Sequence, residues 1–125
     1  MVTPVVKITS AEILQSNTTV KVVVRHDGTA LYFSRSPVPF IRDVALQDWH
    51  TKTAYWLQVG TYAFRRAVLL EYLKWPEGTL EMLEKVEQLR FLEAGKKILT
   101  FETPHQSIAV DTPLDLEKVR GIMAG

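Results

Sequence analysis

Asp111 is the polar residue whose setting most strongly suggests chemistry. It follows a short apolar stretch at residues 108–110 and directly precedes Thr112, which suits the N-cap of a helix. Because Thr112 and Asp115 have the spacing of a capping box, the start of that helix does not require Asp111. A carboxylate at the end of a strand and beside a helix N-terminus is where α/β sheets bind ligands. The alternative is that Asp111 only interacts favourably with the helix dipole, and the local pattern favours neither explanation.

Arg35 and Gln58 are two further polar residues in apolar surroundings. Arg35 lies between the largely apolar residues 30–33 and a loop with two prolines. A guanidinium in such a place can hold a carboxylate or phosphate through two parallel hydrogen bonds. Gln58 interrupts an apolar stretch, and its amide could contact a ligand. The commoner arrangements are a solvated loop arginine and a buried amide that bonds within the protein.

Glu87, Gln88 and Arg90 belong to one stretch with helical spacing. Glu87 and Arg90 are three positions apart and of opposite charge, so an ion pair between them is the favoured explanation. The alternative is that Glu87 and Gln88 reach a polar ligand at the edge of the domain. Elsewhere the histidines lack the spacing of a metal site, and the sequence has no glycine-rich phosphate loop and no nucleophile elbow.

The composition is that of an ordinary globular domain. A chain of 125 residues can form one hydrophobic core, and its 15 basic residues nearly balance its 14 acidic ones. The absence of cysteine excludes disulfides and thiol catalysis. No run of like charge indicates a nucleic-acid-binding arm, and no apolar stretch is long enough to cross a bilayer. We therefore expect a cytoplasmic protein that binds neither nucleic acid nor membrane.

The elements that position these residues alternate between strands and helices. Strands are expected at residues 5–8, 18–25, 30–33, 55–64, 98–101 and 108–110. Helices are expected at residues 10–15, 65–75, 79–94, with Thr79 as the cap, and 114–123. Asp27-Gly28 predicts a hairpin with a primed turn, and residues 44–53 are interpreted as a mobile connection. The predicted fold class is α/β, with a mixed β-sheet and flanking helices.

Three segments together closely resemble the CMP-Kdo synthetases, which are 3-deoxy-manno-octulosonate cytidylyltransferases. The segments are VKVVVRHDGTALYFSRSPVPFIRD, WLQVGTYAFRRAVLLEYLKWPEGTLEMLEKVEQLRFLEAGKKI and VDTPLDLEKVR, of which ALYFSRSPVP is the most specific. These segments occur in the same order as in the family and together cover nearly the whole chain. The resemblance implies that residues 1–125 are a single, partial nucleotide-diphospho-sugar transferase-like domain. It corresponds to the C-terminal half of the family, which binds the sugar acid and forms a homodimer.

The family transfers CMP from CTP to the sugar acid Kdo for lipopolysaccharide synthesis, and it releases pyrophosphate. The resemblance implies that Asp111 is the second of two aspartates that bind Mg²⁺, which neutralises charge on the α-phosphate. It also implies that Arg35, Glu87 and Gln88 lie near the sugar acid. Gln58 stands where the family has a histidine at the sugar site.

Two motifs of the family do not occur in this sequence. One is the glycine- and arginine-rich loop that binds the CTP phosphates, and the other is the Gln-Gly-Asp-Glu-Pro segment with the first magnesium-binding aspartate. We therefore expect the chain to be inactive alone and to need an N-terminal half for CTP.

Two alternative functions stay open. The first is a non-enzymatic binding or oligomerisation module derived from the family, in which the hairpin of residues 20–24 and 30–33 would form contacts. The second is part of a cytidylyltransferase for another 3-deoxy sugar acid, such as a sialic acid, because Gln58 and Ile41 depart from the family pattern.

Overall fold

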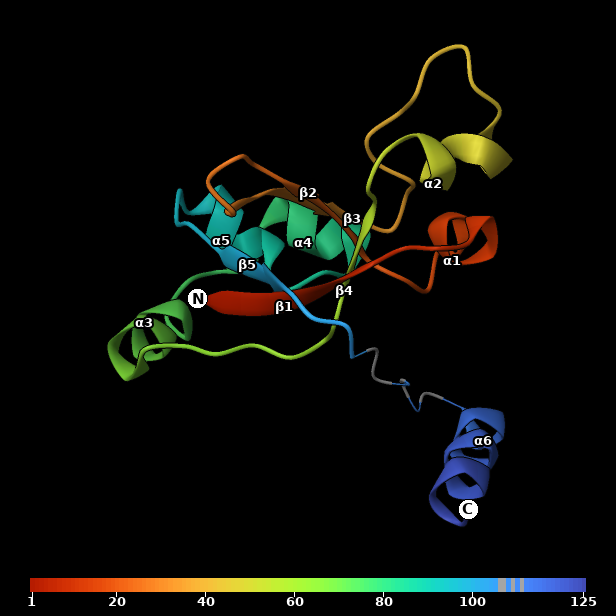
Figure 1. Ribbon diagram of the computed structural model, residues 1–125. Helices are drawn as coiled ribbons and strands as arrows, with labels where there is room; N and C mark the ends of the chain where they lie inside the picture. The colour runs from red at the N-terminus through yellow and green to blue at the C-terminus, as the bar shows by residue number, and fades with distance from the viewer. Residues whose placement is uncertain (106–107, 109, 111) are drawn as a thin grey trace.

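The computed structural model describes residues 1–105, 108, 110 and 112–125, and these residues form a five-stranded sheet with helices around it (Figure 1). The strands are β1 (Val2–Lys7), β2 (Lys21–Val24), β3 (Ala30–Ser34), β4 (Trp56–Gln58) and β5 (Leu99–Glu102). Their order is β3-β2-β4-β1-β5. Since β5 runs parallel to β1 and the other neighbours are antiparallel, the sheet is mixed. The predicted α/β fold class is confirmed.

The hairpin of β2 and β3 brings Arg35 to the end of β3, at the edge of the sheet. The Gly28 N–H donates to the Arg25 carbonyl at 3.0 Å, and the Arg25 N–H donates to the Thr29 carbonyl at 2.8 Å. Gly28 has a φ of 80°, but Asp27 does not have a positive φ, so the turn is not the primed type that needs two such residues. The Asp27 carboxylate instead accepts from the Thr29 N–H at 2.9 Å and fixes this turn.

Seven helical segments connect or flank the described strands. They are α1 (Ala11–Gln15), η1 (Leu46–Asp48), α2 (Trp49–Lys52), α3 (Arg66–Tyr72), α4 (Thr79–Glu84), α5 (Leu89–Glu93) and α6 (Pro113–Met123). The cap predicted for α6 is present, because Thr112 and Asp115 bond reciprocally. Ser10 caps α1 by accepting from the Ile13 N–H. Gly95, with a φ of 71°, follows α5 as expected.

The single helix predicted at 79–94 is wrong, because α4 and α5 are separate helices. Lys85 breaks the helix with a left-handed φ of 54°, and the N-cap of α4 is Gly78 rather than Thr79. Arg35 stabilises this break, since its side chain donates to the carbonyls of Glu84 and Lys85 at 2.7 and 3.1 Å. A continuing helix would have used those carbonyls in its own hydrogen bonds.

The segment before α3 is less regular than its composition predicts. Of the strand expected at 55–64, only β4 is formed. The chain leaves the sheet after β4 and meets β1 again where Ala63 forms an isolated bridge with Val2. The predicted mobile connection at 44–53 instead contains η1 and α2. Trp49 from this region is buried in a second hydrophobic cluster with Ile8, among others.

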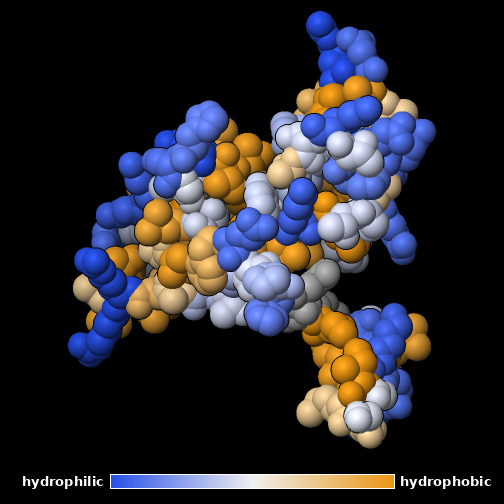
Figure 2. All heavy atoms as spheres, viewed as in Figure 1, coloured by the Kyte–Doolittle hydropathy of each residue, from blue (hydrophilic) through white to orange (hydrophobic). Residues whose placement is uncertain are grey.

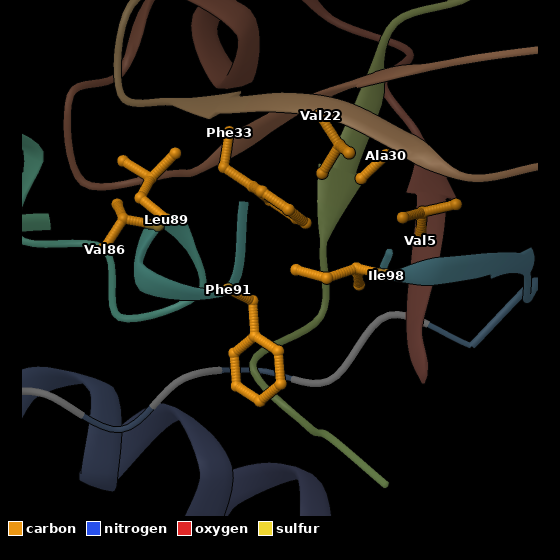
Figure 3. Packing of buried hydrophobic residues seen from close by; sticks show 8 residues of the cluster. All are labelled: Val5, Val22, Ala30, Phe33, Val86, Leu89, Phe91 and Ile98. Atoms are coloured by element: carbon orange, nitrogen blue, oxygen red, sulfur yellow. The ribbon is translucent and has the colours of Figure 1, made fainter. Parts of the chain in front are cut away.

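The main hydrophobic core lies between the sheet and α5 (Figure 3). Phe33 and Leu89 are fully buried at its centre. The cluster consists of Val5, Val22, Ala30, Phe33, Val86, Leu89, Phe91 and Ile98. Because Val86 and Leu89 flank residues 87 and 88, this packing fixes the position of both polar residues next to the core.

Helix α6 extends away from the sheet (Figure 1), and none of its residues is buried. Figure 2 shows apolar side chains gathered along it, and Leu114 is 66% exposed. Of the strand predicted at 108–110, Ile108 and Val110 lie in no regular element, and residue 109 is outside the described residues. Asp111 is also outside them. No helix of the described chain is long and apolar enough to span a membrane.

Candidate functional site

A cavity of about 410 Å³ opens between the segment before β2, strand β4 and the junction of α4 and α5. Its lining comes from residues 18–20, 57–60 and 85–88, together with Arg35 and Tyr62. The cavity therefore contains all the positions in the described chain for which a contact with a ligand was predicted. These residues are Arg35, Gln58, Glu87 and Gln88.

Arg35 joins two walls of this cavity. Besides its bonds to Glu84 and Lys85, its Nη1 donates to the carbonyls of Asn17 and Thr18 at 3.1 and 3.4 Å. The guanidinium is therefore held by backbone carbonyls of two segments and is not the solvated loop arginine that is statistically commoner. Its backbone is fixed as well, because the Arg35 N–H donates to the Glu84 carboxylate at 2.9 Å.

Gln58 and Gln88 supply two nearly buried amides to the cavity, with exposed fractions of 8% and 4%. Nε2 of Gln58 lies 3.4 Å from Oγ1 of Thr3, and Oγ1 of Thr3 in turn donates to the Thr61 carbonyl. Tyr62 contacts both amides. Burial raises the pKa of its phenol, and hydrogen bonding to Gln58 and Gln88 partly opposes that effect. The phenol is therefore protonated at neutral pH and can donate a hydrogen bond.

Glu87 lies exposed at the rim of the cavity, and the ion pair predicted between Glu87 and Arg90 is wrong. Arg90 pairs with Glu81, with Nη2 to Oε1 at 2.6 Å and Nε to Oε2 at 2.7 Å. Glu87 lies in the junction after the left-handed Lys85 and before α5 begins at Leu89, so it does not share a helix with Arg90. Within the described chain, neither a hydrogen bond nor an ion pair engages the Glu87 carboxylate.

Tyr62 and Lys85 are lining residues that sequence reasoning missed. Tyr62 lay within a predicted strand and had no distinguishing pattern. Lys85 lay within a predicted continuous helix, so the break that exposes it at the cavity was not visible in the spacing. Its amine adds a second positive charge to the lining, beside that of Arg35.

The chemistry of this lining suits a polar ligand with several hydroxyl groups and a negative charge. Amides, phenols and hydroxyls can each donate and accept hydrogen bonds, as sugar hydroxyls require. Arg35 and Lys85 favour an anion, and Glu87 can accept from a hydroxyl at the rim. No group of three His, Asp or Glu side chains that could hold a metal occurs among the described residues, which do not include Asp111.

Comparisons with known proteins extend these observations. A family model described as cytidylyltransferase matches residues 1–98. The 3-deoxy-manno-octulosonate cytidylyltransferase of Geobacter sulfurreducens is 52% identical over 105 residues, which cover 80% of this chain and 42% of that protein. The proteins of the same name from Syntrophus aciditrophicus and Escherichia coli are 44% and 47% identical. They align over 100% and 94% of this chain and over 48% and 45% of their own length.

A solved structure gives the same result for the fold. It is a CMP:2-keto-3-deoxy-manno-octonic acid synthetase complexed with CTP, which aligns with a TM-score of 0.86 and 45% identity. The alignment covers 98% of this chain and 48% of the solved chain, so this chain spans about half the length of the relatives that it matches. The predicted nucleotide-diphospho-sugar transferase-like fold is confirmed by this alignment. Since the family model also covers most of its residues, the chain belongs to the cytidylyltransferase family.

Proposed function

We propose that this chain is the sugar-acid-binding and dimer-forming part of a cytidylyltransferase. The complete protein would activate Kdo with CTP, giving CMP-Kdo and pyrophosphate for lipopolysaccharide synthesis. The observation that carries the proposal is the single cavity that collects Arg35, Gln58, Glu87 and Gln88 from distant parts of the sequence. The similarity to 3-deoxy-manno-octulosonate cytidylyltransferases supports the identity of the ligand.

Each lining residue has a role that fits a sugar acid. Arg35 and Lys85 provide positive charge for the carboxylate of the sugar acid. The amides of Gln58 and Gln88 bind hydroxyl groups deep in the cavity, and Glu87 accepts a hydrogen bond from a hydroxyl at the rim. Because Gln58 and Gln88 are nearly buried, a ligand lacking the matching hydroxyls would leave them without partners, which disfavours such ligands.

The proposal assigns the binding of CTP and Mg²⁺ to residues outside the cavity. The described residues hold no acidic cluster for a metal, so Asp111 would bind Mg²⁺ together with carboxylates from another part of the protein. A divalent cation in that place would neutralise charge on the CTP phosphates. We infer that the part of the relatives not matched by this chain supplies the CTP site.

Homodimer formation is part of the same proposal. β3 is an edge strand, and Leu31 on it is exposed, whereas Phe33 points into the core. An edge strand with an exposed apolar side chain can pair with a second copy. Sedimentation at micromolar concentration should therefore give a dimer, and a monomer would contradict this part of the proposal.

Adding the missing part back tests the proposal as a whole. This chain is mixed with the segment of the Geobacter sulfurreducens relative that it does not match, and pyrophosphate release is measured with CTP, Kdo and Mg²⁺. Release is expected only when both parts and both substrates are present, and each part alone serves as the control. No release from a folded, co-purifying pair of parts would contradict the proposal. Replacing Kdo with a sialic acid in this assay tests the alternative substrate.

A non-enzymatic binding or oligomerisation module is the second candidate. The observation in its favour is that α3, α4, β5 and α6 each expose large apolar side chains, among them Leu83, Phe101 and Leu114. Such a surface is typical of a protein that binds another polypeptide. Stable oligomers without pyrophosphate release in the assay above would favour this candidate.

A further inference from the structure

Lys21, at the start of β2, is fully buried, with an exposed fraction of 0%. Lysine is almost never buried to this degree unless its charge is compensated. Here Nζ donates to the Ser16 carbonyl at 2.7 Å, to the Thr19 carbonyl at 2.9 Å and to the Thr19 hydroxyl at 3.2 Å. All three N–H groups of the ammonium therefore have an acceptor in one short segment.

That segment forms a wall of the cavity, since Thr18 and Thr19 line it. Four consecutive backbone carbonyls of the wall are each bound by a cation. Lys21 binds those of Ser16 and Thr19, and Arg35 binds the two between them. Two side chains therefore fix the shape of the wall. Lys21 is buried, and Arg35 also bonds to the break between α4 and α5.

We propose that Lys21 is a positioning residue of the cavity, which holds the wall of residues 16–19 in place without touching the ligand. Its relation to the sugar acid rests on the proposed function, whereas its effect on the wall does not. Without the ammonium, the carbonyls of Ser16 and Thr19 would lose these hydrogen bonds, and the wall would open more often to bind water instead.

A comparison of Lys21→Met with Lys7→Met tests the proposal. Both changes remove one positive charge, but Lys7 is exposed. In Lys21→Met the hydrogen-exchange protection of the Ser16 and Thr18 amides, measured by NMR, should fall about 10-fold or more. The Ala30 amide, which donates to Ile98 across the core, serves as the reference for global stability. Unchanged protection of the wall, or an equal loss at Ala30, would overturn the proposal.

Binding of Kdo separates this inference from the proposed function. Calorimetry should give about 10-fold weaker binding of Kdo to Lys21→Met than to the parent or to Lys7→Met. If the wall opens more often in Lys21→Met but the parent chain with its complementary part binds no Kdo, the proposed ligand is contradicted and the positioning role stands. If Lys21→Met loses protection of the wall but binds Kdo as tightly as the parent does, the wall does not shape the site and the inference fails.

Discussion

The Glu81 carboxylate is nearly buried and depends on Arg90 for its charge. Arg90 donates to both of its oxygens, and the Gly78 N–H donates to it at 3.1 Å. These hydrogen bonds, chiefly those from Arg90, lower the pKa of Glu81. Arg90 also lies over the Tyr72 ring, 4.7 Å from its centroid. The pair holds α5 against α4 next to the cavity.

Removing one partner of this pair should be costly. Arg90→Met leaves a buried carboxylate without its cation, so the free energy of unfolding at pH 7 should fall by about 3 kcal/mol. Urea unfolding measures the change. Lys96→Met, which breaks the exposed ion pair with Glu71, is the matched control and should cost less than about 0.5 kcal/mol. Equal losses in the two variants would show that the Glu81 pair is not buried as described.

The same pair predicts a pH dependence of stability. The pKa of Glu81 is lower in the folded state, so its contribution is complete above the ordinary value of 4.5 and is lost as the pH falls through the folded value. The difference in free energy of unfolding between the parent and Arg90→Met should therefore shrink below about pH 4. A difference that stays constant as the pH falls further through the acid range would contradict the linkage to Glu81.

For individual residues, the sequence predicted which positions are unusual better than it predicted their partners. Gln58 and Gln88 stood out by their type, and the structure brings both to one cavity with Arg35 and Glu87. The partner of Arg90 was missed because helical spacing compares residues within one helix, and Glu81 lies beyond a break. The burial of Lys21 was missed because its acceptors are loop carbonyls, which no residue type in the sequence reveals.

Among the elements, the junction of α4 and α5 decides where the site residues lie. Lys85 adopts a left-handed conformation that costs a non-glycine residue about 1 kcal/mol. The contacts of Arg35 with the carbonyls of Glu84 and Lys85 offset that cost. Gln88 is buried beside the cavity only because the chain turns at this point. Strained positions of this kind are common where a site must be shaped.

Relief of this strain is measurable. Lys85→Gly should raise the free energy of unfolding by about 1 kcal/mol, because glycine adopts this conformation without a steric penalty. Lys85→Ala removes the same side chain but keeps the penalty, so it should give no increase. Chemical denaturation of both variants tests the reasoning, which is incorrect if alanine stabilises the protein as much as glycine.

The elements that local pattern determines were predicted well. The hairpin of β2 and β3 follows from β-branched residues around a glycine turn, and α6 follows from its capping box. The break at Lys85 and the short β4 were not predicted, because both depend on tertiary contacts. Arg35 bonds to the carbonyls at the break, and the chain leaves the sheet after β4 before Ala63 bridges to Val2 of β1.

At the scale of the whole molecule, several elements of the described chain expose large apolar side chains. Helix α6 has no buried residue, and the sheet ends in β5, whose Leu99 and Phe101 are half-exposed. The chain also spans about half the length of its relatives. Under the proposed function, the complementary part of the enzyme would contact some of these exposed side chains.

Two substitutions separate metal chemistry from helix capping near Asp111. The mixture of this chain with the complementary segment of the Geobacter sulfurreducens relative is called the two-part enzyme. In it, Asp111→Asn should abolish Mg²⁺-dependent pyrophosphate release and leave the free energy of unfolding nearly unchanged. Thr112→Ala should instead cost roughly 1 kcal/mol of stability, because it removes the cap of α6. If Asp111→Asn unfolds the chain and Thr112→Ala does not, this division of roles is wrong.

The most direct test of the account is the Michaelis constant for Kdo in the two-part enzyme with Gln88→Leu. Leucine keeps the volume of this buried side chain but removes the amide from the cavity. We predict that KM for Kdo rises about 10-fold or more while KM for CTP stays unchanged. Gln47→Leu, at an exposed position in η1, should change neither constant. An unchanged KM for Kdo, or an equal rise in KM for CTP, would contradict the claim that this cavity binds the sugar acid.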